Sequence, residues 1–198
     1  MAKRRKVGNP LALAVLASLL ERPMHPYELG RQLKERGKDR NIKYNHGSLY
    51  MVVQQLARAE FITSQETVRD TQRPERTVYA ITDAGRAELD DWMRELVAVP
   101  VEEYPLFGVA LSLLGALRPD DVIELLDRRL ETLTEQAEEV RSLTKRALEQ
   151  DLHPFFLIEE DYRLAMLEAE RSFVADLLES IKDREYTRPW REWHKEKR

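Results

Sequence analysis

Residues 45–60 have the sequence NHGSLYMVVQQLARAE, and this stretch decides the fold. Asn45 can cap a helix that runs to about Glu60. The apolar residues of the stretch recur at i, i+3, i+4 and i+7, which is the spacing of one buried stripe on a helix. We therefore predict a helix that is held from behind and presents a polar face. The stripe consists of Leu49, Val52, Val53 and Leu56, and the opposite face presents Gly47, Met51, Gln54 and Arg58, flanked by Ser48, Tyr50 and Gln55.

Two further helices are predicted before this one. Asn9 can cap the first, which has a proline in its first turn and continues over residues 11–20. This helix is apolar on nearly all sides, so we expect it to be buried in its own domain or against a partner subunit. The sequence His25-Pro26-Tyr27-Glu28 starts the second helix, which ends near Gly37. A basic connection, residues 38–43, leads to the polar-faced helix.

The hydrophobic period changes after Glu60. Residues 61–68 and 77–81 are rich in β-branched and aromatic residues, and they flank a polar segment, which predicts a β-hairpin with a polar tip. Thr82 can then cap a fourth helix with one apolar stripe. The predicted order of three helices, a hairpin and a fourth helix is that of a winged helix-turn-helix domain. We place this domain at residues 1–99. The stripe of the fourth helix consists of Leu89, Trp92, Met93 and Leu96.

The second half of the chain is predicted to be helical. Residues 106–117 form an apolar helix, Pro119 opens a long helix to about Asp151, and His153-Pro154 separates it from a last long helix. The two long helices cannot bury their apolar stripes alone, so a partner helix is required. We predict a helical dimerisation domain at 103–185 and a loosely held tail at 186–198, in which Trp190 and Trp193 can dock. The stripes are Leu126, Leu130, Leu133, Ala137, Val140, Thr144 and Ala147, and then Tyr162, Ala165, Met166, Ala169, Phe173, Leu177 and Ile181.

The composition restricts the class of protein. The 198 residues are 42% hydrophobic and 34% charged, which is typical of a soluble globular protein, and none is cysteine. The lack of cysteine excludes a disulfide framework, a cysteine-based zinc site and a thiol nucleophile, and it favours a reducing cytoplasm. The basic residues 3–6 and the apolar residues 11–20 together resemble a signal peptide. However, no cleavage site follows, and the apolar run is too short to span a membrane. We therefore expect a cytoplasmic protein without a membrane partner.

The charge is unevenly distributed along the chain. The formal net charge is −4, yet residues 1–91 hold 16 basic against 12 acidic side chains, and residues 92–198 hold 16 against 24. Such a division indicates a modestly basic contact module joined to an acidic body, with a chance excess as the alternative interpretation.

The polar face of the third helix has the side chains of a DNA recognition helix. The amides of Gln54 and Gln55 can match N6 and N7 of adenine, and Arg58 can reach a guanine or a phosphate. A merely solvated polar face is the alternative. Basic residues before the helix and on the hairpin favour DNA, because they can contact phosphates or the minor groove. The candidate DNA-binding residues are Lys43, Asn45, Ser48, Tyr50, Gln54, Gln55, Arg58, Arg73 and Arg76.

These motifs resemble the PadR-like family of transcriptional regulators. The resemblance is carried by residues 45–50 (NHGSLY), by residues 73–82 (RPERTVYAIT) and by Ala84-Gly85, and it extends over nearly the whole chain. It implies a mainly α fold with a small β-hairpin wing and a C-terminal long-helix dimerisation domain. It also implies a homodimer that binds double-stranded DNA at an inverted-repeat operator. Finally, it implies that the protein represses transcription and that a small molecule relieves this repression.

The chain departs from the family pattern at two positions. Met51 stands where the family usually has proline. Methionine permits a regular helix, so this difference affects the DNA sequence specificity more than the fold. Gln72 stands where the wing turn usually has glycine, which bears on the minor-groove contact of Arg73.

An aromatic effector has one candidate contact. Some relatives bind flat aromatic or phenolic ligands near the dimer interface, and Trp92 could provide a stacking surface for one. A packed interface tryptophan is the alternative interpretation, because aromatic residues at helical spacing are usually buried.

Catalysis and metal binding are not predicted. The four histidines show no ligand spacing, and the sequence has neither a Gly-rich phosphate loop nor a nucleophile elbow. We therefore expect no enzyme, no metal and no cofactor. The remaining rival is a winged-helix module that binds another protein, which would lack the salt dependence of a DNA-binding protein.

Overall fold

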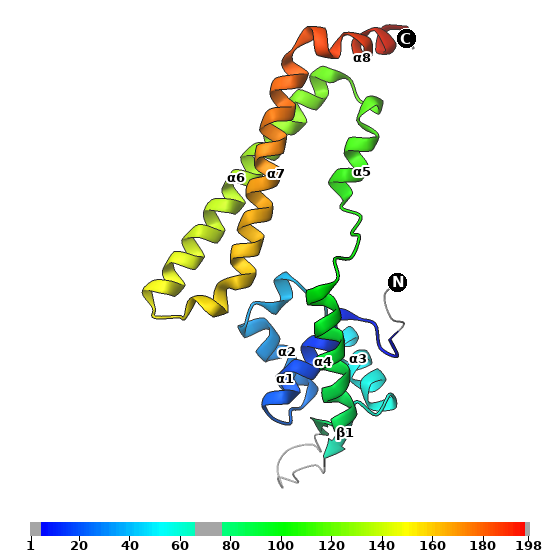
Figure 1. Ribbon diagram of the computed structural model, residues 1–198, viewed down its shortest axis with the longest axis vertical. Coiled ribbons are helices and arrows are strands. Elements are labelled where there is room, and N and C mark those ends of the chain that lie inside the picture. Colours follow the sequence, from blue (N-terminus) through cyan, green and yellow to red (C-terminus); the bar gives the residue numbers. More distant parts are fainter. Residues whose placement is uncertain (1–4, 66–76, 197–198) are drawn as a thin grey trace. The chain divides into compact units, whose positions relative to one another are not determined.

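The computed structural model describes residues 5–65 and 77–196, which fold into two compact units (Figure 1). The first unit ends at Glu102 and the second begins at Glu103. The predicted fold class is confirmed, since the described chain is mainly helical and has one small antiparallel hairpin.

The first unit has the element order of a winged helix. Its elements are α1 (Pro10–Glu21), α2 (Pro26–Glu35), α3 (His46–Arg58), β1 (Ile62–Gln65), β2 (Val78–Ile81) and α4 (Asp83–Ala98), with a 3-10 turn at Lys38–Arg40. Two of the predicted caps begin α1 and α4. The side chain of Asn9 accepts a hydrogen bond from the amide of Leu11, and that of Thr82 accepts one from Gly85. The side chain of His25, which was not predicted as a cap, accepts a hydrogen bond from the amide of Tyr27 at the start of α2.

The core of the first unit lies between α1 and α3. The stripe predicted for α3 is confirmed, because each of its four residues is at most 1% exposed. The four residues pack with apolar side chains of α1, among them Leu11, Val15 and Leu16. Because α3 is anchored along this one side, its opposite side faces solvent.

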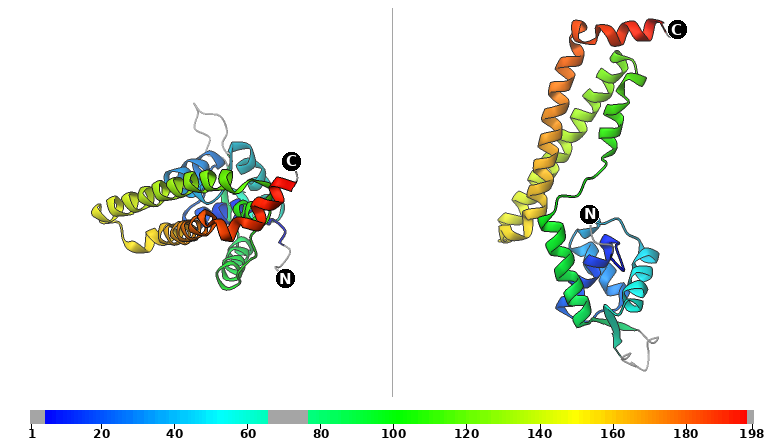
Figure 2. Two further views of the ribbon diagram at one scale, coloured as in Figure 1. Left: turned by 90° about the horizontal axis from the view of Figure 1, so that it is seen from above. Right: turned by 45° about the vertical axis from the view of Figure 1, so that its right-hand side comes forward.

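The hairpin pairs β1 with β2 in antiparallel register, with Ile62 opposite Ile81 (Figure 2, right). The sequence did not predict one further pairing. The amide of Met24 donates to the carbonyl of Tyr79 at 3.0 Å, and the amide of Tyr79 donates back to Met24 at 3.0 Å. The segment between α1 and α2 thus ties the hairpin to the helices.

Gly85 holds the start of α4 against the hairpin. A Cβ atom at this position would lie 2.0 Å from the carbonyl oxygen of Phe61, and 2.9 Å from a side-chain carbon of Ile81. We expect Gly85→Ala to lower the free energy of unfolding by about 3 kcal/mol, since a backbone group cannot yield as a side chain does. Denaturant unfolding measures this change. The control is Gly8→Ala, where nothing lies within 4 Å of an added Cβ. Equal stability of the two variants would contradict the packing described for Gly85.

The second unit is a helical hairpin with two shorter helices. It contains α5 (Leu106–Ser112), α6 (Pro119–Glu149), α7 (Ile158–Lys182) and α8 (Arg184–Glu196), with 3-10 turns at Leu114–Ala116 and Pro154–Leu157. Helices α6 and α7 run side by side in opposite directions (Figures 1 and 2). Their shared core contains Val122, Leu126 and Leu133 of α6 and Val174, Leu178 and Ile181 of α7.

The stripe predicted for α7 is not the face that packs within the chain. Tyr162, Met166 and Phe173 are exposed, and of the predicted stripe Ile181 alone is fully buried. The helix has two apolar faces, and α6 covers the one that holds Val174 and Leu178. Residues on α4 behave similarly, since Leu89 and Trp92 are buried whereas Met93 and Leu96 are exposed.

Two predicted segments have different secondary structure from that expected. The apolar helix expected at 106–117 ends at Ser112, and a 3-10 turn that contains Gly115 follows. The expected loose tail at 186–198 is wrong for its described part, which lies in α8. Contacts with the start of α6 explain this helix, because the indole N–H of Trp190 donates to the carbonyl of Leu117 at 3.0 Å and Arg191 pairs with Asp120 at 2.8 Å.

Candidate nucleic-acid interface

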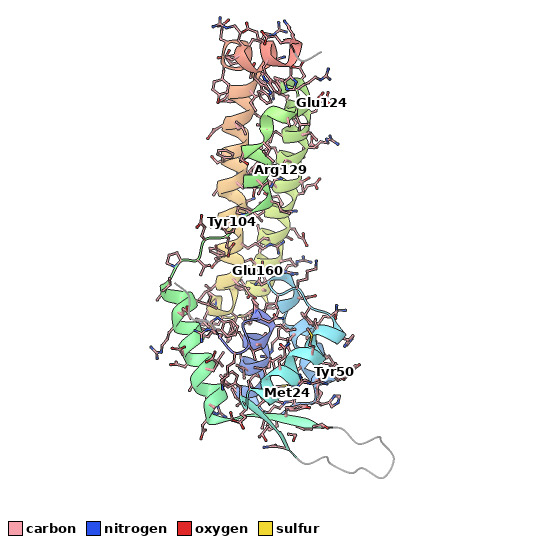
Figure 3. All side chains as sticks on the ribbon, turned by 90° about the vertical axis from the view of Figure 1, so that its right-hand side faces the viewer. Met24, Tyr50, Tyr104, Glu124, Arg129 and Glu160 are labelled. Carbon is pink, nitrogen blue, oxygen red and sulfur yellow. The ribbon has the colours of Figure 1, made fainter. Side chains whose placement is uncertain are left out.

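The outer face of α3 presents the side chains expected of a recognition helix. Tyr50, Gln54, Gln55 and Arg58 are all exposed, and Figure 3 shows Tyr50 at the outer side of the helix. Within residues 5–65 and 77–196, no carboxylate forms an ion pair with Arg58. The guanidinium of Arg58 is therefore available to an external anion or base edge.

The start of α3 is fixed by two of the predicted site residues. The amide of Ser48 donates to the side-chain oxygen of Asn45 at 2.8 Å, and the amide of Asn45 donates to the hydroxyl of Ser48 at 2.8 Å. The Ser48 hydroxyl also donates to the carbonyl of Asn45 at 2.9 Å. The two side chains thus form a capping box, which aligns the helix and leaves the Ser48 hydroxyl proton engaged.

A basic hollow lies beside the start of α3. It has a volume of about 390 Å³ and is lined by Arg31 and Lys34 of α2 and by Asn45 and His46 at the α3 start, among other residues. Residues 36–58 carry five Lys or Arg side chains against one carboxylate, that of Asp39. This local excess of positive charge, with the first amides of α3 nearby, favours a phosphate.

Tyr27 and His46 line this hollow, and the sequence analysis did not single them out. Their rings are parallel at 6.4 Å, and close by the rings of His25 and Tyr50 meet edge to face at 6.4 Å. The signal was present in the sequence, since both histidines lie at helix starts. These contacts place α2 and α3 in a fixed mutual position.

Tyr44 anchors the turn that precedes α3. Its hydroxyl donates to the carbonyl of Gly30 at 3.2 Å. Burial, and then the negative charge of Asp39, raise the pKa of this phenol above its ordinary value, so the hydroxyl keeps its proton at neutral pH. Lys43, next to it in the chain, is exposed.

The remaining predicted site residues fall into two groups. Arg73 and Arg76 lie outside the described residues. Trp92 is 7% exposed and belongs to the core of the first unit, and the guanidinium of Arg5 lies 5.1 Å from its ring centre. This burial favours the packed tryptophan over an open stacking surface.

Two searches of the described residues had negative results. Among residues 5–65 and 77–196, no group of three or more His, Asp or Glu side chains could hold a metal ion. In the same part of the chain, no helix has the length and apolar character needed to cross a membrane.

Part of the chain matches a known protein family. Residues 15–91 match the sequence model of the family described as "Transcriptional regulator PadR-like family". A probable transcriptional regulator of Mycobacterium tuberculosis is 36% identical over 86 residues, 41% of this chain and 42% of that protein. The negative transcriptional regulator PadR of Bacillus subtilis is 27% identical over 118 residues, 58% of this chain and 63% of that protein. The matched segments thus span less than two thirds of either relative.

Solved structures share the fold over most of the chain. Bacillus subtilis PadR in complex with operator DNA covers 87% of this chain and 99% of its own, with a TM-score of 0.71 and 18% identity. The same protein in complex with p-coumaric acid gives a TM-score of 0.68, with the same identity and shares covered. The matching proteins are regulators of transcription and not enzymes, in agreement with the interpretation of the sequence.

Proposed function

We propose that the chain, whose residues 15–91 match the model of the PadR-like family of transcriptional regulators, binds double-stranded operator DNA as a homodimer, with α3 of each subunit in a major groove. The observation that carries this proposal is the outer face of α3. Exposed amide, hydroxyl and guanidinium groups stand there on a helix whose other side is fully buried. Such a helix can present these groups to base edges without rearrangement.

The basic hollow is the place where we expect the DNA backbone to contact the protein. Arg31 and Lys34 lie beside the α3 start, so a phosphate there would be held while the outer face of α3 reads the adjoining bases. Phosphate contacts of this kind fix the register of a protein on the duplex, and base contacts then specify the sequence.

Exposed apolar side chains in the second unit support the homodimer. Leu106 is 85% exposed and Met166 is 54% exposed. The ring of Phe107 meets that of Phe173 edge to face at 6.5 Å and lies under the guanidinium of Arg129 at 3.6 Å, so α5 adjoins the exposed face of α7. Apolar surfaces of this kind usually mark an interface. A second copy of the chain is the occupant that the unpartnered apolar stripe favours.

Repression and an effector are further parts of the proposal. The Bacillus subtilis relative is a negative regulator, and its structure with p-coumaric acid supports a small aromatic effector here. Trp92 could stack on such a ligand if Arg5 moved away from its ring. Because the protein acts on DNA and the relatives are bacterial, we propose a cytoplasmic location.

Tyr50→Phe tests the orientation of α3. The Tyr50 hydroxyl makes no hydrogen bond within the described residues, so its removal leaves the fold unchanged. We expect operator affinity to fall by about 3- to 10-fold, which is the net value of one ordinary protein hydrogen bond. Fluorescence anisotropy with labelled duplex measures the change, and Tyr186→Phe on α8 is the matched control. Unchanged affinity in Tyr50→Phe would show that this side of α3 does not meet DNA.

Selection from a random DNA pool at near-physiological salt tests the function itself. We expect enrichment of an inverted repeat, because a two-fold symmetric dimer presents two equivalent α3 helices. A pool without enrichment, with only weak binding to all duplexes, would instead favour the protein-interaction module.

A further inference from the structure

Arg5 is a nearly buried cation that the DNA interface does not use. Its side chain is 4% exposed. One terminal nitrogen donates to Glu88 at 3.0 Å and to Asp91 at 3.0 Å, and the other donates to Glu95. The three carboxylates are three and four positions apart, so they lie on one face of α4. A single guanidinium thus joins the chain start to three points along this helix.

The chain around Arg5 is seated on the first unit. Val7 is 6% exposed and packs in the core, and the ammonium of Lys6 lies 5.7 Å from the ring centre of Phe61. Arg5 itself lies over the ring of Trp92 at 5.1 Å, where a cation is attracted by the negative face of the indole. Residues 5–8, which we call the N-terminal strap, are thus held on the first unit through Arg5, Lys6 and Val7, and Arg5 covers the ring of Trp92.

The strap holds a part of α4 that buries no side chain of its own. The buried residues of α4 are Gly85, Leu89 and Trp92, so no described side chain after Trp92 is buried in this helix. Glu95 lies in this later part and is held by Arg5. Because α4 carries the chain from the first unit to the second, its last turns connect the DNA-binding face to the helical unit.

We propose that Arg5 is a positioning residue for operator binding, which fixes the last turns of α4 on the winged-helix unit and keeps Trp92 covered. This inference rests on the proposed function. Loss of Arg5 would remove its contacts with Glu88, Asp91 and Glu95, and the carboxylate of Glu88, which is 16% exposed, would lose the cation that offsets its desolvation. The last turns of α4 would then be held less firmly on the first unit, and the proposed dimer would lose more conformational freedom when its two first units bind DNA.

Two variants distinguish this role from a direct attraction between Arg5 and DNA. Arg5→Ala removes a positive charge and Glu88→Gln removes a negative charge, so a direct electrostatic effect would weaken DNA binding in the first and strengthen it in the second. A positioning role predicts that both weaken it. We expect a loss of roughly 2- to 30-fold, the range for residues that act on a site through an intervening element. The matched controls are Arg94→Ala and Asp90→Asn, an exposed ion pair on the same helix.

The salt dependence of binding gives an independent readout. A buried Arg5 contacts no phosphate, so Arg5→Ala should leave the slope of log affinity against log salt unchanged. A slope reduced by about 0.9, the value for one phosphate contact, would overturn the proposal. So would unchanged affinity in both variants, or opposite changes in the two.

Quenching of Trp92 fluorescence by acrylamide tests the covering of the ring without DNA. With Trp190 and Trp193 replaced by phenylalanine, Trp92 is the single tryptophan of the chain. We expect stronger quenching in Arg5→Ala and Glu88→Gln than in the parent, in samples that unfold cooperatively. Equal quenching would overturn the proposal. If the parent bound no duplex at all, the proposed function would fail, and this quenching result would still decide whether Arg5 holds the strap on α4.

Discussion

Arg58→Ala should weaken binding to the enriched operator by about 10- to 100-fold and leave the dimer intact. A good arginine contact to a base is worth about 1–3 kcal/mol of discrimination, and a phosphate contact lowers affinity for all duplexes. Arg58 is exposed on the outer face of α3 and has no ion-pair partner in the described part of the chain. We therefore expect its loss to change the stability of the folded protein little and to act mainly on the complex.

The measurement is a titration of labelled operator and of a scrambled duplex, with the dimer followed by sedimentation. Arg94→Ala removes an exposed arginine from α4 and serves as the control. A base contact would reduce the preference for the operator over the scrambled duplex, and a phosphate contact would reduce both affinities. If Arg58→Ala bound both duplexes like the parent, the orientation assigned to α3 would be wrong.

Met166→Asp should raise the dissociation constant of the dimer by about 100-fold or more. Met166 is exposed in the middle of the apolar face of α7. A symmetric interface carries the substitution twice, and each buried carboxylate without a partner costs several kcal/mol. Operator binding should fall with dimerisation, since one α3 helix alone can contact only one half-site.

Ser172→Asp is the matched control for this variant. It adds the same charge to an exposed position of α7, about 120° around the helix from Met166 at 100° per residue. Sedimentation at several concentrations compares the two proteins. Dimers of equal strength in both variants would place the subunit interface elsewhere on the second unit.

The sequence was sufficient for the parts of the fold that are set by local chemistry. The stripe of α3 was predicted residue by residue, because all four of its members point to the core of one unit. The caps Asn9, Asn45 and Thr82 were also predicted, since each is a short polar side chain directly before an apolar period.

Elements that depend on a choice of partner could not be predicted in the same way. Helix α7 has two apolar faces, and its sequence does not say which one α6 covers, so the exposed face around Met166 was expected to be the main stripe. In α8 the aromatic residues Tyr186, Trp190 and Trp193 recur at helical spacing, but Pro189 lies among them, and a proline inside a sequence argues against a continuous helix.

Contacts between segments that are distant in the sequence could not be predicted from the sequence pattern. Arg5 and Glu88 are 83 positions apart, and a basic start is more often solvated than buried. Trp92 was predicted as a candidate stacking surface for a ligand. The residues next to it in the sequence do not indicate that Arg5, far away along the chain, lies over its ring. The site residues on α3 remain predictions, each testable by one substitution.

The central claim is that a dimer of this chain recognises a DNA sequence through α3. Its most direct test is the affinity of the parent protein for the selected duplex and for a scrambled duplex, measured at several salt concentrations. We predict a clear preference for the selected duplex and a steep decrease of both affinities with salt, at about −0.9 in the logarithmic slope for each phosphate contact. Equal, weak affinities with a slope near zero would contradict the claim and favour a protein partner for the outer face of α3.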